Sequence, residues 1–202
     1  MSKILIVNGT QPCEFAPGRL NASLVQWAQD ALTGMGHEVR VTTVAEGYDI
    51  NAEIDAHVWA DVVIMQFPVN WMGVPWVFKK YIDEVYTAGM DGRLLAGDGR
   101  TAEAPKANYG TGGLLHGTKY MLSVTFNAPR EAFDNPTEPF FAGASVDDLL
   151  WPMHLNAKFL AMQPLPTFAA FDVMKNPRIE QDFQRFDAHL KEHFEEIAHV
   201  AA

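Results

Sequence analysis

The chain has 202 residues, 48% of them apolar and 20% charged, which fits one soluble globular domain with a substantial core. A formal net charge of −10 at pH 7 excludes a surface for nucleic acid or for an anionic membrane, because either needs clustered lysine and arginine. The single cysteine, Cys13, excludes an internal disulfide framework and predicts a reducing, cytoplasmic location. We expect no membrane insertion, because no apolar run approaches roughly 18 residues.

Strand and helix patterns alternate in the first part of the chain. The β-branched run KILIV at residues 3–7 predicts a strand, and apolar residues at helical spacing predict a helix from about Leu20 to Gly34. An alternating strand at 38–44 and a short helix at 51–59 follow. This alternation predicts a parallel sheet wound right-handedly, with helices on both faces.

Residues 60–85 carry three signals in succession. The run Val62–Met65 has no polar face and predicts a central strand buried on both sides. The segment Phe67–Gly73 then breaks any periodicity and places large apolar side chains at the carboxyl end of that strand. Pro75 suits the first turn of the helix that follows. In an open α/β sheet this is where a planar ligand binds.

The second part of the chain contains two irregular segments. Periodicity is lost from Thr87 to Gly117, and a segment this long predicts a functional loop, with disorder as the alternative. The other irregular segment, 130–145, contains Phe133, Phe140 and Phe141. The remaining expected elements are a strand at 119–126, a helix at 146–162 kinked or started near Pro152, a strand at 166–173, and a helix capped by Asn176 that starts at Pro177 and runs to about Val200, with Ile197 in its buried stripe. The whole pattern predicts a single α/β domain over residues 1–202, a doubly wound five-stranded parallel sheet of order 2-1-3-4-5.

Three loops at strand ends point to a flavin. They follow Asn8, Gln66 and Thr125, and in this strand order their strands are adjacent, so the loops meet at one crevice. A flavin would use all three: aromatic walls from Phe67, Trp71 and Phe126, and phosphate-binding N–H groups at the helix start. Asn127 and the backbone N–H groups of Val69 to Trp71 could stabilise the negative charge that develops on the reduced ring.

Other chemistries have less support. Cys13 has no fixed histidine partner, and His189 and His193 lie four residues apart on a helix rich in glutamate, which favours a solvated face over a metal site. We therefore predict no metal. His154 could face the crevice or a partner subunit, although a satisfied interior histidine is the favoured interpretation. Motifs of hydrolases, P-loop NTPases and Rossmann dehydrogenases are absent from the sequence.

With these residues in view, the chain resembles the modulator of drug activity B branch of the flavodoxin-like NAD(P)H:quinone reductases. The resemblance covers essentially the whole length. It is most specific in ADVVI-Q-P--WMG-PW--KKYID from Ala60 to Asp83, in KYMLS-T-NAP-EAF from Lys119 to Phe133, and in FL-M-PLPTF from Phe159 to Phe168. The helix-start pattern G-LN at Gly18, Leu20 and Asn21 also matches.

The resemblance implies an FAD-dependent enzyme that reduces quinones by two electrons. Hydride would pass from NADPH to the flavin and then to the quinone in alternating half-reactions, with a protective role against quinone or oxidative stress. It also implies a homodimer with flavin sites near the interface. The cofactor-binding residues that it implies are Ala16, Pro17, Gly18, Arg19, Leu20, Asn21 and Ser23, then Pro68, Val69, Asn70, Trp71 and Met72, then Tyr109, and finally Thr125, Phe126, Asn127 and Ala128.

No side-chain nucleophile is expected, because the flavin carries the covalent chemistry, and Trp71 and Phe126 are the candidates for stacking against the substrate. The chain departs from the family pattern at Ala16–Pro17 and at Val69–Asn70, which affects the flavin contacts and the substrate preference. Three alternatives stay open at this point: an FMN-dependent azo- or nitroreductase, a regulatory flavoprotein subunit of a transport system, and a one-electron carrier of the flavodoxin kind.

Overall fold

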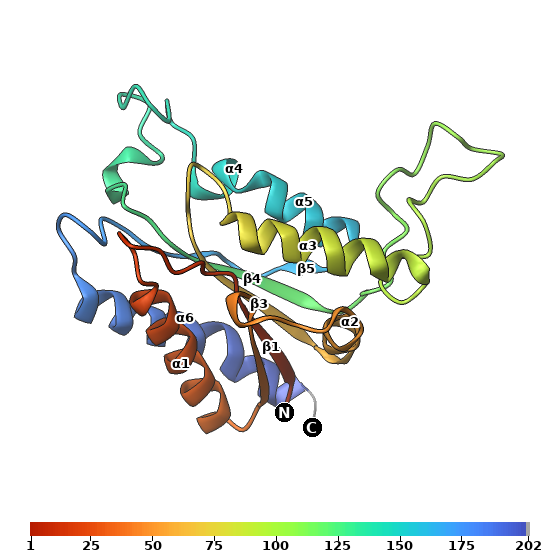
Figure 1. Cartoon of the computed structure of the whole chain (residues 1–202), viewed down its shortest axis with the longest axis horizontal. Helices are drawn as coiled ribbons and strands as arrows, with labels where there is room; N and C mark the ends of the chain where they lie inside the picture. The colour runs from red at the N-terminus through yellow and green to blue at the C-terminus, as the bar shows by residue number, and fades with distance from the viewer. Residues whose placement is uncertain (201–202) are drawn as a thin grey trace.

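The computed structural model describes residues 1–200, in which a parallel sheet lies between two layers of helices (Figure 1). The strand order is β2-β1-β3-β4-β5, and β6 also pairs with β4, so the expected doubly wound order is confirmed. The strands are β1 Lys3–Asn8, β2 Glu38–Thr43, β3 Val62–Pro68, β4 Lys119–Thr125, β5 Gln163–Pro164 and β6 Phe168–Ala170. The helices are α1 Arg19–Gly34, α2 Ile50–Trp59, α3 Trp76–Ala88, α4 Val146–Leu149, α5 Trp151–Phe159 and α6 Ile179–Val200, with single 3₁₀ turns η1 Val44–Glu46, η2 Gly89–Asp91 and η3 Arg130–Ala132.

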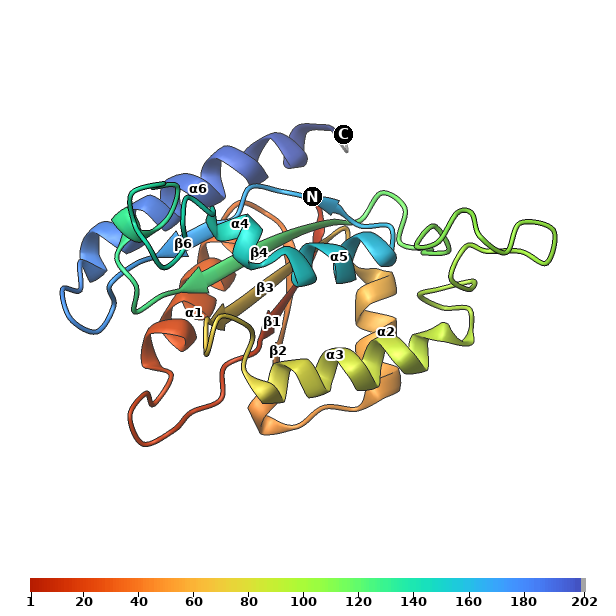
Figure 2. The ribbon, with the colours of Figure 1, turned by 90° about the horizontal axis from the view of Figure 1, so that it is seen from above.

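The central strand β3 is buried on both faces, as its apolar sequence predicts. Val62 and Ile64 pack with α1 and α6 on one side of the sheet, whereas Val63 and Met65 pack with the helices of the other side. Figure 2 shows the same layers from above. Strand β3 therefore contributes alternate side chains to two separate cores, which is why its run Val62–Met65 is entirely apolar, and its one polar residue, the buried Gln66, lies near its carboxyl end.

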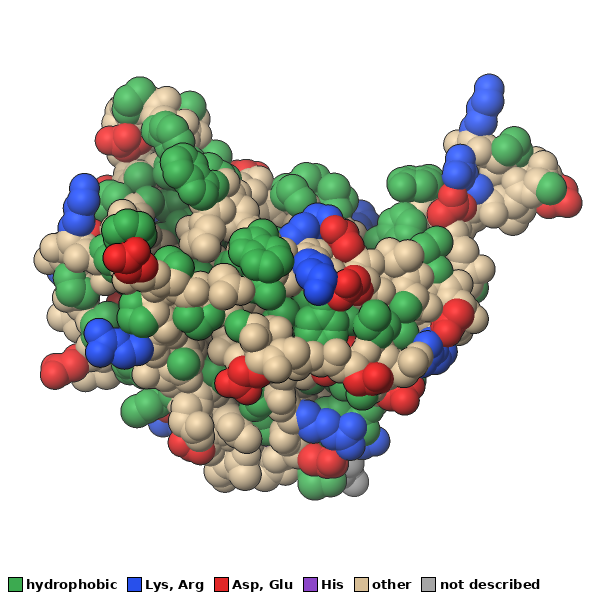
Figure 3. Space-filling model, viewed as in Figure 1, with side chains coloured by type: hydrophobic (Ala, Val, Ile, Leu, Met, Phe, Trp, Pro, Cys, Tyr) green, Lys and Arg blue, Asp and Glu red, His purple; other side chains and the backbone are tan. Residues whose placement is uncertain are grey.

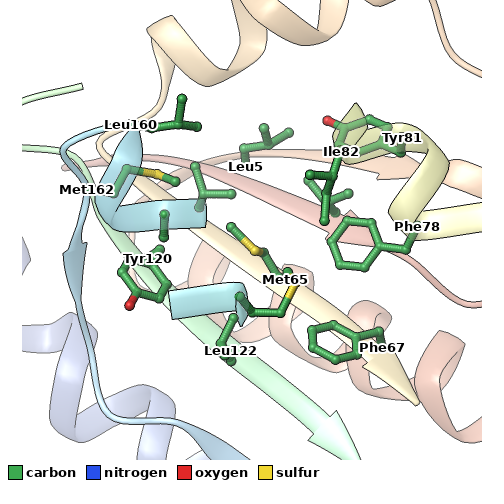
Figure 4. Packing of buried hydrophobic residues seen from close by; sticks show 14 of the residues in the cluster. Leu5, Met65, Phe67, Phe78, Tyr81, Ile82, Tyr120, Leu122, Leu160 and Met162 are labelled. Atoms are coloured by element: carbon green, nitrogen blue, oxygen red, sulfur yellow. The ribbon is translucent and has the colours of Figure 1, made fainter. Parts of the chain in front are cut away.

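The larger core lies under α3 and α5 and is rich in aromatic side chains. Phe67 at the end of β3 contacts Phe78 on α3, with ring centroids 5.4 Å apart, and Phe78 in turn contacts Tyr81 (Figure 4). These rings are fully buried, and burial of each such side chain stabilises the fold by roughly 1.5–3 kcal/mol. They fix the start of α3 directly beneath the loop that follows β3.

The predicted fifth strand was wrong in its bounds. Two short strands, β5 and β6, take its place, because Pro164 and Pro166 lack the N–H groups that a continuous ladder needs. The N–H of Leu165 still donates to the carbonyl oxygen of Tyr120 at 2.7 Å, so the interrupted segment stays beside β4.

Two predicted helices also differ in the structure. The helix expected over 146–162 is divided into α4 and α5 at Leu150, with Pro152 in the first turn of α5. Helix α6 begins at Ile179, so Asn176 does not cap it. The side chain of Ile197 lies outside the described residues.

Two long irregular segments lie outside this framework. Residues 92–117, which we call the arm, project from the end of α3 (Figures 1 and 2). Residues 133–144, which we call the flap, follow η3 and are closed at their base by a hydrogen bond from Asp134 N–H to the Ala144 carbonyl oxygen at 3.0 Å. Among residues 1–200 no helix has the length and apolarity to cross a membrane.

Candidate functional site

The carboxyl ends of β1, β3 and β4 lie side by side and bring the three predicted loops together. Asn8 pairs with Gln66, and Pro68 pairs with Thr125. The loops that follow these strands therefore leave the sheet side by side at its carboxyl end. This carboxyl end of the sheet is the candidate site.

The first loop leaves hydrogen-bonding groups open at the start of α1. Gly18 has φ +79°, and a Cβ at this position would lie 2.8 Å from Cγ2 of Thr10, so glycine is required on both counts. Ala22 donates the first helical N–H bond to the Gly18 carbonyl oxygen, which leaves the N–H groups before it without helical partners. Thr10 is 4% exposed, and among residues 1–200 its hydroxyl has no hydrogen-bond partner. These donors, with no acidic residue in the first turn of α1, suit an anion such as a phosphate.

A buried polar chain fixes this helix start to the sheet. The Gln66 amide donates to Oδ1 of Asn21 at 2.8 Å, and the Asn21 amide donates to the Thr125 hydroxyl at 3.1 Å. All three side chains are buried. The side chains of Asn21 and Thr125, both predicted to contact the cofactor, thus fix the positions of the loops relative to one another.

The second loop is a strained turn that presents Trp71. Asn70 and Gly73 exchange two backbone hydrogen bonds, of 2.8 and 3.1 Å. Between them, Trp71 and Met72 have φ values of +48° and +65°, a left-handed conformation that costs about 1–2 kcal/mol per residue without glycine. The Trp71 side chain is 96% exposed, so it stands as a wall of the site rather than as its floor.

The third loop supplies the floor. Phe126 is 3% exposed and stacks on Phe171, with ring planes 9° apart and centroids 5.6 Å apart. Asn127 and Ala128 follow at the surface beside it.

Between the second and third loops lies a hollow of about 450 Å³, which we call the crevice. It is lined by Val69, Trp71, Met72, Phe126, Asn127, Ala128, Ala132, Phe140 and Phe141. None of these side chains is ionisable, although the chain as a whole carries a net charge of −10. The crevice therefore suits a planar, uncharged ring system.

Sequence reasoning did not assign Phe140 and Phe141 to the site. Both belong to the flap, which lies far from Trp71 in the sequence. Two adjacent phenylalanines in an otherwise polar, irregular segment were the available signal, because ligand pockets are lined mainly by hydrophobic and aromatic side chains.

Four predicted cofactor-binding residues of the first loop and the start of α1 remain at the surface. Ala16, Pro17 and Ser23 are exposed, and Arg19 is exposed at the start of α1. The loop is closed by two backbone hydrogen bonds between Cys13 and Ala16.

Tyr109 is not brought to the crevice of its own chain. It lies on the arm and packs against Phe159 at the end of α5, with ring centroids 5.6 Å apart. Because α5 runs from the flap back toward the amino ends of the strands, Phe159 lies at the opposite end of the sheet from the crevice. Within one chain, Tyr109 therefore does not join the residues that line the crevice.

His154 has partners on both ring nitrogens. The Tyr120 hydroxyl lies 2.7 Å from Nδ1, and Asp147 Oδ1 lies 3.2 Å from Nε2. The hydrogen bond from His154 lowers the pKa of Asp147, whereas burial raises the pKa of Tyr120 to about 12. His154 thus ties α5 to α4 and β4, as the interior interpretation predicts.

Known proteins match this chain along nearly its whole length. The family model for the flavodoxin-like fold matches residues 2–194. The NADPH:quinone oxidoreductase MdaB of Haemophilus influenzae is 46% identical over 191 residues, which are 95% of this chain and 98% of that protein. A crystal structure of a candidate quinone reductase from Klebsiella pneumoniae has a TM-score of 0.75 at 24% identity and covers 98% of this chain and 85% of its own. The FMN complex of general stress protein 14 from Treponema denticola has a TM-score of 0.64 at 22% identity and covers 95% of this chain and 99% of its own.

Proposed function

Because this chain belongs to the modulator of drug activity B family of flavodoxin-like proteins, we propose that it is an enzyme that reduces quinones by two electrons, with NADPH as donor and FAD as bound cofactor. The net reaction converts NADPH, a proton and a quinone into NADP⁺ and a hydroquinone. The observation that carries the proposal is the uncharged aromatic crevice beside a helix start with open N–H groups.

The residues present fit a flavin. The unpartnered Thr10 hydroxyl and the N–H groups after Gly18 offer donors for phosphate, and the crevice offers apolar walls for the ring. The flavin, when bound, would accept hydride from NADPH and pass it to the quinone. Every other contribution comes from the chain itself, as positioning and electrostatics.

Each wall of the crevice has a distinct task. Phe126 is held rigid between Phe133 and Phe171 and supports a ring from below. Trp71 covers the same space from the side and excludes water from it. Asn127, exposed at the rim, places an amide donor where negative charge develops on the reduced ring.

We further propose a homodimer. Trp76 on α3, and Trp151 and Leu155 on α5, are large, exposed apolar side chains on the same side of the sheet. Figure 3 shows hydrophobic side chains on either side of charged ones over α3 on this face, with the arm projecting beyond the body. Because the arm points away from its own crevice, Tyr109 would meet a flavin only in the second subunit. The expected role is protection of the cytoplasm from quinones, and the single exposed Cys13 fits that reducing compartment.

One purification tests these proposals. The flavin released from the protein is identified by chromatography, and NADPH oxidation is followed with and without menadione. We expect FAD, steady turnover with menadione, and the mass of a dimer by light scattering. Release of FMN would overturn the cofactor assignment, and a single stoichiometric reduction without turnover would overturn the enzyme.

A variant tests the site. Trp71→Ala should fold normally and lose quinone reduction, because the side chain is almost fully exposed and lines the crevice. The matched control is Met174→Ala, which removes an exposed apolar side chain elsewhere. Quinone reduction at the wild-type rate in Trp71→Ala would contradict the proposed role.

A further inference from the structure

The flap places an exposed phenylalanine at the rim of the crevice. Phe140 is 69% exposed, although it lines the hollow together with Trp71 and Phe126. Trp71 comes from the loop after β3 and Phe140 from the segment after β4, so the two rings lie on different walls. Contiguous exposed apolar patches mark binding surfaces, and ligand pockets are lined mainly by hydrophobic and aromatic side chains.

The flap is anchored by the neighbouring side chain. Phe141 stacks on buried Phe133, with centroids 4.4 Å apart and planes 23° apart, and Phe133 lies 4.9 Å from Phe126. The ring of Phe140 meets Phe141 edge-on at 4.8 Å. Phe141 therefore holds the flap to the floor of the crevice, and this leaves a face of Phe140 available to a ligand.

The crevice has no ionisable side chain that could pair with a charged substituent. All of its lining side chains are apolar except the neutral Asn127. A sulfonate or carboxylate on the ligand would lose its water without gaining a partner, which is unfavourable. The ligand class that fits is an uncharged, fused aromatic ring system.

We propose that Phe140 determines substrate specificity, and that it selects uncharged two-ring quinones over one-ring quinones. This inference rests on the proposed function and adds the substrate class. The dinucleotide donor can be held along its whole length, whereas a small quinone is held mainly through its ring faces. A second fused ring extends the quinone toward the rim, where Phe140 offers a stacking contact.

The experiment compares Phe140→Ala with the wild type, both loaded with flavin. We expect kcat/KM for menadione to fall about 3- to 10-fold, the size of one aromatic stacking contact, and that for para-benzoquinone to change less than about 2-fold. The rate of flavin reduction by NADPH, measured alone, should stay the same. Affinity of the oxidised protein for menadione, measured by calorimetry without NADPH, should fall by the same factor as kcat/KM. Phe140→Tyr should restore both values, and menadione sulfonate should be a poor substrate of the wild type.

Met90→Ala is the matched control, because Met90 is a similarly exposed apolar side chain in η2, just beyond the end of α3. Equal effects on both quinones, or none on menadione, would overturn the inference. Slower flavin reduction in Phe140→Ala would also overturn it, since the ring would then serve the donor. A wild type that oxidises no NADPH with any quinone refutes the proposed function instead, and the calorimetric comparison still tests Phe140.

Discussion

The flap and the arm are both long, irregular segments with no periodic pattern, yet they take opposite positions. The flap folds onto the floor of the crevice through Phe133 and Phe141, which stack on each other. The arm leaves the body, and its paired stem contains Gly112, where a Cβ would lie 2.1 Å from the Gly97 carbonyl oxygen. The flap is thus fixed by buried aromatic area. The base of the arm is anchored by Leu94, Leu95 and Leu115, which are buried in the larger core, whereas its outer part is held by close backbone contacts. We expect the flap and the base of the arm to be energetically part of the core, and the outer part of the arm to be nearly independent of it.

The largest expected loss of stability follows from removing the aromatic side chain that anchors the flap. Phe133→Ala should lower the free energy of unfolding by about 3–5 kcal/mol, because Phe133 is buried against Phe126, Phe141 and Phe171. Urea unfolding measures the loss. The corresponding change on the arm, Tyr109→Ala, should cost about 1 kcal/mol or less, because that ring is exposed and makes one aromatic contact. Equal losses would contradict the comparison.

The next effect concerns the base of the arm. A Cβ at Gly113 would lie 2.2 Å from the backbone carbonyl carbon of Leu160, so Gly113→Ala should cost about 1–3 kcal/mol by overpacking the end of α5. Gly117→Ala is the control: it meets no atom within 4 Å and is limited to the conformational penalty of φ +93°, about 1 kcal/mol. If the two variants unfold at the same urea concentration, the arm is not fixed at Gly113.

A smaller change, a gain in the free energy of unfolding, is expected for a substitution in the crevice. Met72→Gly should raise the free energy of unfolding by about 1 kcal/mol, because glycine adopts φ +65° without strain. The same variant should lose activity, since Met72 lines the crevice. Ala161→Gly relieves a comparable conformation, φ +70°, away from the crevice, and should gain stability without losing activity. A Met72→Gly protein with full activity would show that the strain has no functional purpose.

The smallest effect lies within the arm. Arg100 donates to Asp98 at 2.8 Å and lowers the pKa of that carboxyl below its usual 3.8. Because the pKa of Asp98 is lower in the folded arm than in the unfolded chain, the ionised carboxylate stabilises the arm at pH values above the ordinary pKa. This contribution is lost as the pH falls through the pKa of the folded state. Arg100→Ala should raise the pKa of Asp98 toward 3.8 in an NMR titration, with the urea midpoint at pH 7 unchanged, because both side chains are solvent-exposed. A shifted midpoint would mean that the arm is coupled to the core.

The sheet could be predicted from the sequence because its signals are local. The unbroken apolar run of β3 required burial on both faces, and the alternation of strands and helices required a parallel sheet wound in one hand. The meeting of three loops then followed from strand order alone. Strand and helix ends near Pro152, Pro164 and Pro166 could not be predicted. A proline interrupts a helix or strand, but its position alone does not show whether the element ends before it or begins at it.

The sequence by itself determined where the candidate site lies and that its walls are aromatic, since both depend on residues next to strand ends. The tertiary structure alone decided which distant side chains join or leave that site. It placed Phe140 at the rim, turned Tyr109 toward Phe159 and gave His154 two partners, the buried Tyr120 and the exposed Asp147. Each of these outcomes depends on contacts between segments far apart in the chain. Irregular segments have no hydrophobic periodicity, so the sequence does not indicate which of their side chains face the core.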